Sequence, residues 1–393
     1  MVKETLRELE VLAEQREKEL VRRRKEGVPV IACSGTYIPE EMIRAAGAET
    51  FVLCPGERPA SGEPVLNDCL RYMNPLTKSL VSSVLSSRND PEALPFDLLV
   101  TQQTDCHTAR AAEYLASSGV PVCMTGIPAD WGNPEAFDYF ADSLREMMAK
   151  VEEITGCGVD SDKAKEYFAK TGRINALFRE LDSLRKAGDP PFSFSDWIRL
   201  HRASFMVDHD AMIEKLEQLC KKLTEETGST GIRHRIRSPR ILIAGRALAL
   251  CNLIVPDVIE NCGAAIAGEF LDEGVRVYER DIEPGPDLLL QFAGNRYLDT
   301  VPGNFMQSSW ENRAAHVKRL IAERRIDAVV WNQFSFDEIY DLEYTFISKQ
   351  LEAMGIPVIK LESGCEESEA SLGRLMTKTE SFVEAVGQRY GQI

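Results

Sequence analysis

The chain has 393 residues, of which 44% are hydrophobic and 27% are charged, and its formal net charge is −16. This length is large for a single hydrophobic core and predicts two or three domains in a soluble, globular protein. The negative charge argues against nucleic acid as a partner, and no apolar run approaches the roughly 18 to 20 residues of a membrane span.

The ten cysteines are scattered along the chain, and no two of them form a Cys-x-x-Cys pair. Residues 1–4 do not start a signal peptide, so we expect a reduced, cytoplasmic protein rather than a disulfide framework. Zinc-ribbon and thioredoxin-like functions lack their motif. Cys123, Cys220 and Cys262 stand within apolar patterns and are interpreted as packing residues.

The first segment, 3–26, has leucines at helical spacing and predicts an amphipathic helix packed on the body of the protein or on a partner subunit. Buried strands are predicted at 29–33 and 50–53. Between them a helix begins at Pro39, with acidic residues in its first turn, and ends at Gly47.

The most informative stretch contains a predicted strand at 96–101, a polar loop, a helix opened by Cys106 and a further strand at 120–124. Cys106 therefore stands just past the carboxyl end of a strand, where open α/β sheets build their sites. Backbone N–H groups and the helix dipole at that position would stabilise a thiolate. The alternative is a small packing residue at the strand–helix junction.

Cys69 follows a loop rich in Gly and Pro and precedes a helical segment at 76–85, so it also lies near a loop-to-helix junction. Residues 137–225 have charged sequence with helical periodicity and predict a helical insert. The short basic cluster at 233–237 is interpreted as part of a solvated linker.

The second half resumes the alternation of strands and helices, with strands predicted at 240–245, 264–267, 327–332 and 356–361. Three segments of the first half resemble segments of the second half in the same order: 39–48 and 256–264, 96–100 and 326–330, and 119–122 and 355–358. This ordered repeat predicts two similar domains joined by helices.

The predicted fold class is α/β, with two Rossmann-like parallel-sheet lobes, a helical connecting region and an N-terminal helix. The predicted domains are the N-terminal helix (1–26), the first lobe (27–135), the helical region with its linker (136–237) and the second lobe (238–393). The carboxyl ends of the strands in each lobe would face the cleft between the lobes, which is the expected site.

Several common chemistries lack their motifs. The chain has no P-loop, no dinucleotide fingerprint, no Gly-x-Ser-x-Gly elbow and no His-Glu-x-x-His spacing. His107 is not favoured as a base for Cys106, because neighbours at a helix start usually point apart. Thiolate ligation of an iron–sulfur cluster stays open, since its cysteines need not be close in sequence.

The residues resemble the 2-hydroxyacyl-CoA dehydratase and benzoyl-CoA reductase family. Residues 37–48 resemble its opening signature, and Cys69, with Pro75 and Lys78, resembles its first cluster-cysteine region. Thr104-Asp105-Cys106 resembles the second such region, while 355–362 and 379–384 resemble the closing strand and helix. The length suits one of the smaller subunits, and a related branch of the family holds a double-cubane cluster.

This resemblance implies an iron–sulfur cluster, most simply [4Fe-4S], with Cys69 and Cys106 as metal ligands. It implies a dimer with a related or identical subunit, an ATP-dependent activator that delivers low-potential single electrons, and an acyl-CoA substrate. The enzyme would be an acyl-CoA dehydratase or reductase, and the protein would ligate the cluster, exclude water and position the thioester.

The sequence departs from the family pattern in the second lobe. Family members carry a cysteine after the strand equivalent to 328–332, where this chain has Ser335, and the extra cysteines of the double-cubane branch are absent, as Arg246 and Leu271 illustrate. Ser335 is therefore predicted as the second lobe's contribution to the cofactor site. Cys33, Cys251 or Cys365 could supply the missing thiolate ligand instead.

Two alternatives stand beside this hypothesis. One is a divergent, cluster-poor partner or binding subunit with the same fold. The other is a two-lobed small-molecule binder outside the family.

Overall fold

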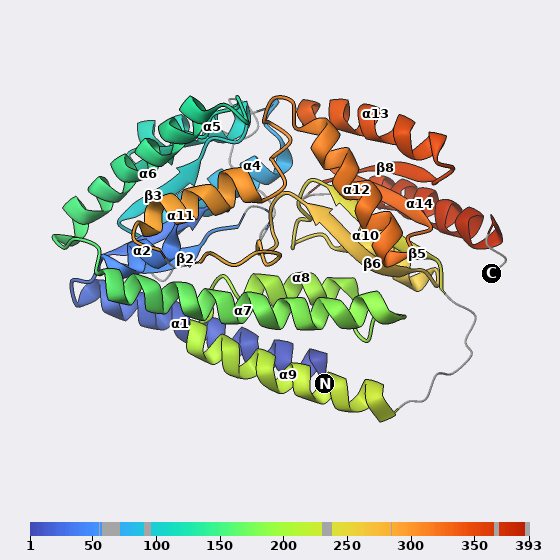
Figure 1. The fold of residues 1–393 in the computed structure, drawn as a ribbon, viewed down its shortest axis with the longest axis horizontal. Coiled ribbons are helices and arrows are strands. Elements are labelled where there is room, and N and C mark those ends of the chain that lie inside the picture. Colours follow the sequence, from blue (N-terminus) through green and yellow to red (C-terminus); the bar gives the residue numbers. More distant parts are fainter. Residues whose placement is uncertain are drawn as a thin grey trace.

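The computed structural model describes residues 1–54, 56, 71–89, 96–229, 238–283, 285–364 and 369–389. These residues form two lobes that lie side by side, with a layer of long helices along one side of both (Figure 1). Three features singled out in the sequence lie outside the described residues: Cys69, Cys365 and the basic cluster at 233–237.

Each lobe contains a four-stranded parallel sheet, and both sheets have the same strand order. The first is ordered β2-β1-β3-β4 and the second β6-β5-β7-β8. The strands are β1 (Val30–Ser34), β2 (Glu49–Val52), β3 (Leu98–Gln102), β4 (Val122–Thr125), β5 (Arg240–Gly245), β6 (Ala265–Leu271), β7 (Ala328–Phe334) and β8 (Val358–Ser363). The predicted fold of two Rossmann-like lobes is confirmed, and each predicted strand occurs with slightly shifted ends.

The central strands are buried along their whole length because helices cover both faces of each sheet. Every residue of β1, β3, β5 and β7 is buried. Such strands read as continuous apolar runs rather than as alternating patterns, which is why they are visible in the sequence. The strand order places a topological switch point between β1 and β3, and another between β5 and β7.

The helices fall into three groups. Those of the first lobe are α2 (Glu40–Ala45), α4 (Pro75–Asn89), α5 (Cys106–Ser117) and α6 (Pro134–Thr155). Those of the second lobe are α10 (Ile254–Asn261), α12 (Trp310–Arg324), α13 (Glu338–Ala353) and α14 (Glu369–Arg389). The helical layer contains α1 (Val2–Lys25), α7 (Ser161–Ala187), α8 (Phe194–Ala203) and α9 (His209–Ser229).

The N-terminal helix α1 packs on the body of the protein, which was one of its two predicted positions. Leu6 and Leu9 belong to the large core that the helical layer shares with the second lobe, and Leu20 belongs to a core of the first lobe. The helical layer therefore contacts both lobes. Within the described ranges, no helix is long and apolar enough to cross a membrane.

One segment leaves the second lobe and packs on the first. After β6 the chain forms α11 (Leu288–Gly294) and the π-helical turn η1 (Asn295–Asp299), which lie beside α6 (Figure 1). Phe292 and Tyr297 are buried in a core of the first lobe. Chain order alone would assign this segment to the second lobe. The predicted domain boundaries stay a prediction.

Gly245 ends β5 at the switch point of the second lobe. Its φ of +108° is rarely adopted by residues that have a side chain, and a Cβ at this position would overlap the carbonyl oxygen of Asn332 in β7. The same close approach lets the Arg246 N–H donate to that oxygen at 2.9 Å. Gly245 thus allows the backbone after β5 to pass close to β7, so that Arg246 enters the cleft.

We predict that Gly245→Ala lowers the free energy of unfolding by more than about 2 kcal/mol, because it adds backbone strain and a steric overlap at once. Urea unfolding measures the change. Gly263→Ala is the matched control, since Gly263 also has a positive φ, +86°, but has open space around its Cβ position. Equal losses in the two variants would show that the close approach to Asn332 is unimportant.

Candidate functional site

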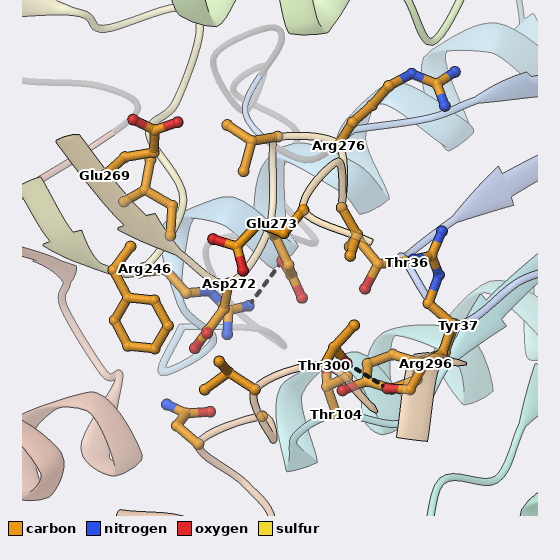
Figure 2. A pocket seen from close by; sticks show the side chains of 18 of the residues that line it. Thr36, Tyr37, Thr104, Arg246, Glu269, Asp272, Glu273, Arg276, Arg296 and Thr300 are labelled. Carbon is orange, nitrogen blue, oxygen red and sulfur yellow. Dashed lines mark hydrogen bonds and ion pairs between the residues drawn. The ribbon is translucent and has the colours of Figure 1, made fainter. Parts of the chain in front are cut away.

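A cavity of about 140 Å³ lies between the lobes, at the carboxyl ends of their strands (Figure 2). Loops from both sheets line it, because the two switch points face the same cleft. Its polar lining residues include Tyr37 after β1, Thr104 after β3, Arg246 after β5, and Asp272 and Glu273 after β6. This is the position at which an open α/β fold binds ligands.

Arg246 is the buried cation at the centre of the cleft and is only 3% exposed. Its Nη1 lies 3.3 Å from Asp105 Oδ2 of the first lobe, and its Nη2 lies 3.5 Å from Glu273 Oε2. The guanidinium also stands over the ring of Tyr340, 5.1 Å from the centroid. The ion pair with Asp105 therefore joins one lobe to the other.

These charges shift one another's ionisation. Burial opposes the charge of Arg246, but Glu273, Tyr340 and Asp105 outweigh burial, so the pKa of Arg246 is raised well above its ordinary value. Burial alone would raise the pKa of Asp105, but Arg246 and hydrogen bonds from Thr108 outweigh burial and lower it. The Arg246–Asp105 pair is therefore ionised at neutral pH.

Asp105 also fixes the start of α5. Its carboxylate accepts the Thr108 N–H at 2.7 Å, while the Thr108 hydroxyl accepts the Asp105 N–H at 3.2 Å. This reciprocal pair is a capping box, which satisfies backbone donors that the helix leaves unpaired. The Asp105 side chain thus both positions Cys106 and pairs with Arg246 of the other lobe.

A second buried arginine, Arg313, is held by two carboxylates, one of which, Asp272, lines the cavity. Its Nη atoms donate to the two oxygens of Asp272 at 2.8 and 3.0 Å, and its Nε donates to Glu343. The Tyr340 hydroxyl donates to Asp272 at 2.8 Å, so this group is connected to Arg246 through Tyr340. Bidentate pairs of this kind fix geometry as well as charge.

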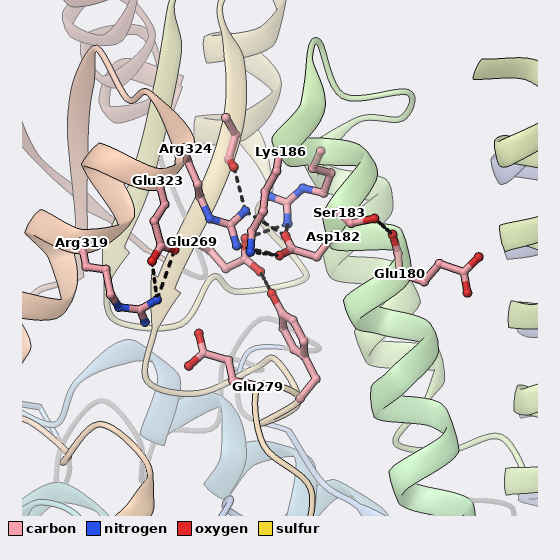
Figure 3. A network of polar contacts seen from close by, with 12 residues as sticks. Glu180, Asp182, Ser183, Lys186, Glu269, Glu279, Arg319, Glu323 and Arg324 are labelled. Atoms are coloured by element: carbon pink, nitrogen blue, oxygen red, sulfur yellow. Dashed lines mark hydrogen bonds and ion pairs between the residues drawn. The ribbon is translucent and has the colours of Figure 1, made fainter. Parts of the chain in front are cut away.

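A further ionic network fixes the helical layer on the second lobe (Figure 3). Arg324 donates to both oxygens of Asp182 in α7, at 2.9 and 2.7 Å. Arg185 of the same helix donates to Glu269 of β6 at 2.8 Å. Because Glu269 lies on the strand that leads into the cleft, α7 also supports the wall of the cavity.

Cys106 is found at the predicted place, as the first residue of α5, and it is exposed. The prediction of a stabilised thiolate is wrong for the protein alone. Partial burial of the sulfur and the negative charges of Asp105 and Glu338 raise the pKa of Cys106, and its backbone hydrogen bond lowers the pKa by less. The backbone hydrogen bond at the helix start lowers the pKa of Cys106 as expected, but burial and the neighbouring carboxylates together outweigh it.

The loop that contains Ser335 faces the start of α5 from the other lobe. Ser335 stands in the loop that connects β7 to α13, and it is partly buried. His107 Nε2, next to Cys106, lies 3.7 Å from Glu338 Oε2 at the start of α13. The structure therefore brings the Cys106 and Ser335 loops to the same edge of the cleft, while Cys69 is outside the described residues.

The family model for the 2-hydroxyglutaryl-CoA dehydratase D-component matches residues 35–386. The chain belongs to this family. The resemblance identified from the sequence is therefore confirmed, and the matched range covers most of both lobes and the helices α7, α8 and α9 of the helical layer.

Two relatives of the D-component family match over nearly their whole length. A protein of Escherichia coli, provisionally named dehydratase subunit YjiM, is 24% identical over 364 residues, with 92% of each chain covered. The beta subunit of (R)-2-hydroxyglutaryl-CoA dehydratase from Acidaminococcus fermentans is 22% identical over 381 residues, covering 93% of this chain and 95% of that subunit. Both names describe dehydratase subunits, so this family member is a dehydratase-type enzyme component.

A solved laminin-binding adhesin from Streptococcus agalactiae also matches over 91% of this chain and 99% of its own, with 11% identity and a TM-score of 0.22. At this score the match supports no conclusion about either fold or function.

The described residues do not by themselves fit the cluster that the family resemblance implies. A [4Fe-4S] cluster is held by cysteine thiolates. Within the described ranges, no group of three or more His, Cys, Asp or Glu side chains is placed to hold a metal. At this edge of the cleft they supply the thiol of Cys106 and the hydroxyl of Ser335. Cys33 is buried within β1, and Cys251 is partly buried in the loop after β5.

Sequence reasoning found the edge of the cleft but missed its charged centre. It noted Arg246 only as a position without cysteine, and it did not single out Asp272, Arg313 or Tyr340. One signal was available for Arg246, because it follows the strand that repeats β1 and must therefore stand at a switch point. No comparable signal identifies Asp272 or Arg313.

The ionisation of Asp337, a buried residue near Arg246, makes the stability of the protein depend on pH. It stands at the start of α13 and accepts the Phe334 N–H at 3.2 Å. Burial raises the pKa of Asp337 to about 6, although Arg246 and the Phe334 N–H oppose this shift. In the unfolded chain an aspartate ionises at about pH 4, so between about pH 4 and 6 the folded state binds more protons and stability falls as pH rises.

We predict that the unfolding free energy of Asp337→Asn minus that of the wild type is larger at pH 7.5 than at pH 4, by roughly 1 to 3 kcal/mol. The amide cannot ionise, but its oxygen can still accept the Phe334 N–H. Urea unfolding at both pH values tests this. Asp341→Asn is the control, because a hydrogen bond from Lys360 lowers the pKa of the partly buried Asp341, so its contribution to stability changes mainly below about pH 4 and little between the two pH values. A difference that does not change with pH would contradict the assignment.

Proposed function

We propose that this chain is the iron–sulfur subunit of a 2-hydroxyacyl-CoA dehydratase or of a benzoyl-CoA reductase-like enzyme. The observation that carries the proposal is the cavity between the lobes, with the Cys106 helix start and the Ser335 loop at its edge. Membership of the D-component family over residues 35–386 supports the dehydratase activity. In this proposal the cavity holds the acyl end of an acyl-CoA thioester.

The chain's own residues suit the binding of a thioester. The Thr104 hydroxyl lines the cavity and is buried without a hydrogen-bond partner among the described residues. Tyr37 also lines it, and burial raises the pKa of Tyr37, so its phenol stays protonated as a donor. A buried polar group without a partner is costly, so an oxygen of the ligand is the natural acceptor for the Thr104 hydroxyl, with the Tyr37 phenol as a second donor. The walls held by Arg246 and Arg313 would exclude water around it.

The proposal includes a cluster with Cys69 and Cys106 as thiolate ligands and Ser335 nearby. A cluster of this kind would supply single-electron chemistry at low potential when it is bound. The proposal also includes a related subunit, in a homodimer or heterodimer, and an ATP-dependent activator as electron donor. These parts rest on the family resemblance.

A second candidate function is a cluster-poor partner subunit with the same fold. Two observations favour it: the second lobe offers Ser335 in place of a thiol, and Arg246 with its carboxylate partners fills the place after β5. A serine hydroxyl is a harder ligand than a thiolate and suits iron–sulfur chemistry poorly. In this alternative the cleft would bind a ligand without holding a cluster.

The iron and sulfide contents of anaerobically purified protein distinguish the two functions. We predict that the wild type contains both elements and that Cys69→Ser and Cys106→Ser each lower them severalfold, because each removes a thiolate ligand. Ser335→Cys should raise iron occupancy by adding a thiolate at the same edge. Cys157→Ser is the matched control, since Cys157 is also exposed but follows α6, away from the Ser335 loop.

Iron-free wild-type protein would support the cluster-poor subunit instead. Unchanged iron in Cys106→Ser would remove Cys106 from the ligand set. Unchanged iron and sulfide in Ser335→Cys would show that the loop after β7 is not a ligand position.

A further inference from the structure

Two arginines of the cleft have no carboxylate partner among the described residues. Arg276 and Arg296 line the cavity between the lobes (Figure 2), and together with Arg246 they also line a neighbouring cavity of about 70 Å³. Among the described residues, no carboxylate oxygen lies within the 4.0 Å ion-pair distance of either guanidinium. Arg246 and Arg313, in contrast, each pair with two carboxylates.

Neutral groups hold Arg276 in place. Its Nε donates to the Ser204 hydroxyl at 2.8 Å and its Nη2 donates to the Ser204 carbonyl at 2.7 Å. Its guanidinium also stands over the ring of Phe205, 5.2 Å from the centroid. These contacts fix the position of the charge without neutralising it.

Arg296 is less satisfied than Arg276. Its Nη1 donates to the Asn295 side-chain oxygen at 3.1 Å, and its guanidinium stands 5.4 Å from the centroid of the Phe292 ring. Its Nε is buried and has no hydrogen-bond partner among the described residues. A guanidinium has five N–H donors in a planar fork, and most of those of Arg296 are available.

The nearest acids do not compensate these charges fully. Glu40 and Glu41, at the start of α2, attract both arginines from beyond ion-pair distance, and Glu41 accepts a hydrogen bond from Thr171 at 2.7 Å. Burial lowers the pKa of Arg276 and of Arg296 in spite of this attraction. A desolvated cation with unused donors is stabilised by an anion that reaches it.

We infer that Arg296 and Arg276 form an anion-binding site for a small carboxylate within the cleft. The guanidinium fork matches the two oxygens of a carboxylate. The cavity of about 140 Å³ has room for a short acid beside the two guanidinium groups. The site is formed by the segment between β6 and α12 and is distinct from the Cys106 and Ser335 loops.

The carboxylate has two possible sources. It is either a free carboxylic acid or a carboxylate at the far end of an acyl chain whose other end is the CoA thioester. The second source rests on the proposed function, and the first does not.

The first experiment uses butyrate and its neutral isostere butyramide as probes, with calorimetry on the full-length protein. We expect butyrate to bind and butyramide to bind at least about tenfold more weakly, which is the usual effect of a hydrogen bond to a charged group. Arg296→Gln should weaken butyrate binding by roughly the same factor, and Arg276→Gln should weaken it too. Arg280→Gln is the matched control, because Arg280 belongs to the same segment but its side chain is 61% exposed.

The second experiment compares succinyl-CoA with butyryl-CoA, which have equal chain length and differ by the terminal carboxylate. Tighter binding of succinyl-CoA to the wild type, lost in Arg296→Gln, identifies the acyl chain as the source. Equal binding of both thioesters, unchanged in Arg296→Gln, would overturn the anion site while leaving the proposed function intact. Binding of butyrate without binding of either thioester supports the anion site and counts against the proposed function.

Thermal unfolding separates a binding role from a structural one. Arg296 forms no ion pair with the part of the chain that the structure describes, so Arg296→Gln should leave the unfolding midpoint of the ligand-free protein unchanged or raised. A lowered midpoint, with butyrate binding equal to that of the wild type, would show that Arg296 is a structural residue and would overturn the inference.

Discussion

The buried ion pair between Arg246 and Asp105 is the interaction on which the rest of the cleft depends. It joins the loop after β5 to the loop after β3, so Arg246 is shared between Asp105 of the first lobe and Glu273 of its own lobe. Separating the lobes at this point would remove one of the two carboxylates from Arg246 and would leave Asp105 without its cation, which is unfavourable for a buried pair. The same carboxylate caps α5, so the relative position of the lobes and the position of Cys106 are set together.

The cleft owes its location to the repeated strand order. Both sheets carry their switch point between corresponding strands, and the carboxyl ends of the two sheets meet across one cavity. Gly245 allows β5 and β7 to approach closely at that point, and the Asn332 amide donates to the carbonyl oxygens of Arg246 and Ala247. The backbone after β5 is therefore held before any ligand arrives, as a binding site requires.

The distribution of charge divides the cleft into a structural part and an available part. Arg246, Arg313, Arg185 and Arg324 are all paired with carboxylates and hold elements together. Arg276 and Arg296 are held by neutral groups, on the segment that crosses from the second lobe to the first. The hydroxyls of Thr104 and Tyr37 line the same cavity. The cavity thus brings the Thr104 hydroxyl, which has no hydrogen-bond partner among the described residues, together with two arginines that form no ion pair with those residues.

The sequence by itself determined the two-lobed fold, because buried parallel strands are continuous apolar runs that differ from the helical periodicity around them. It also placed Cys106 at a helix start, since the strand, loop and helix that position it are adjacent along the chain. It could not show that Arg246 pairs with Asp105, which is 141 residues away. Nor could it show that η1 packs on the first lobe. Whether a charged residue is paired, as Arg313 is, or has no ion pair among the described residues, as is the case for Arg296, depends on distant residues that meet only in the folded chain. The tertiary structure alone decided the charged centre of the cleft for this reason.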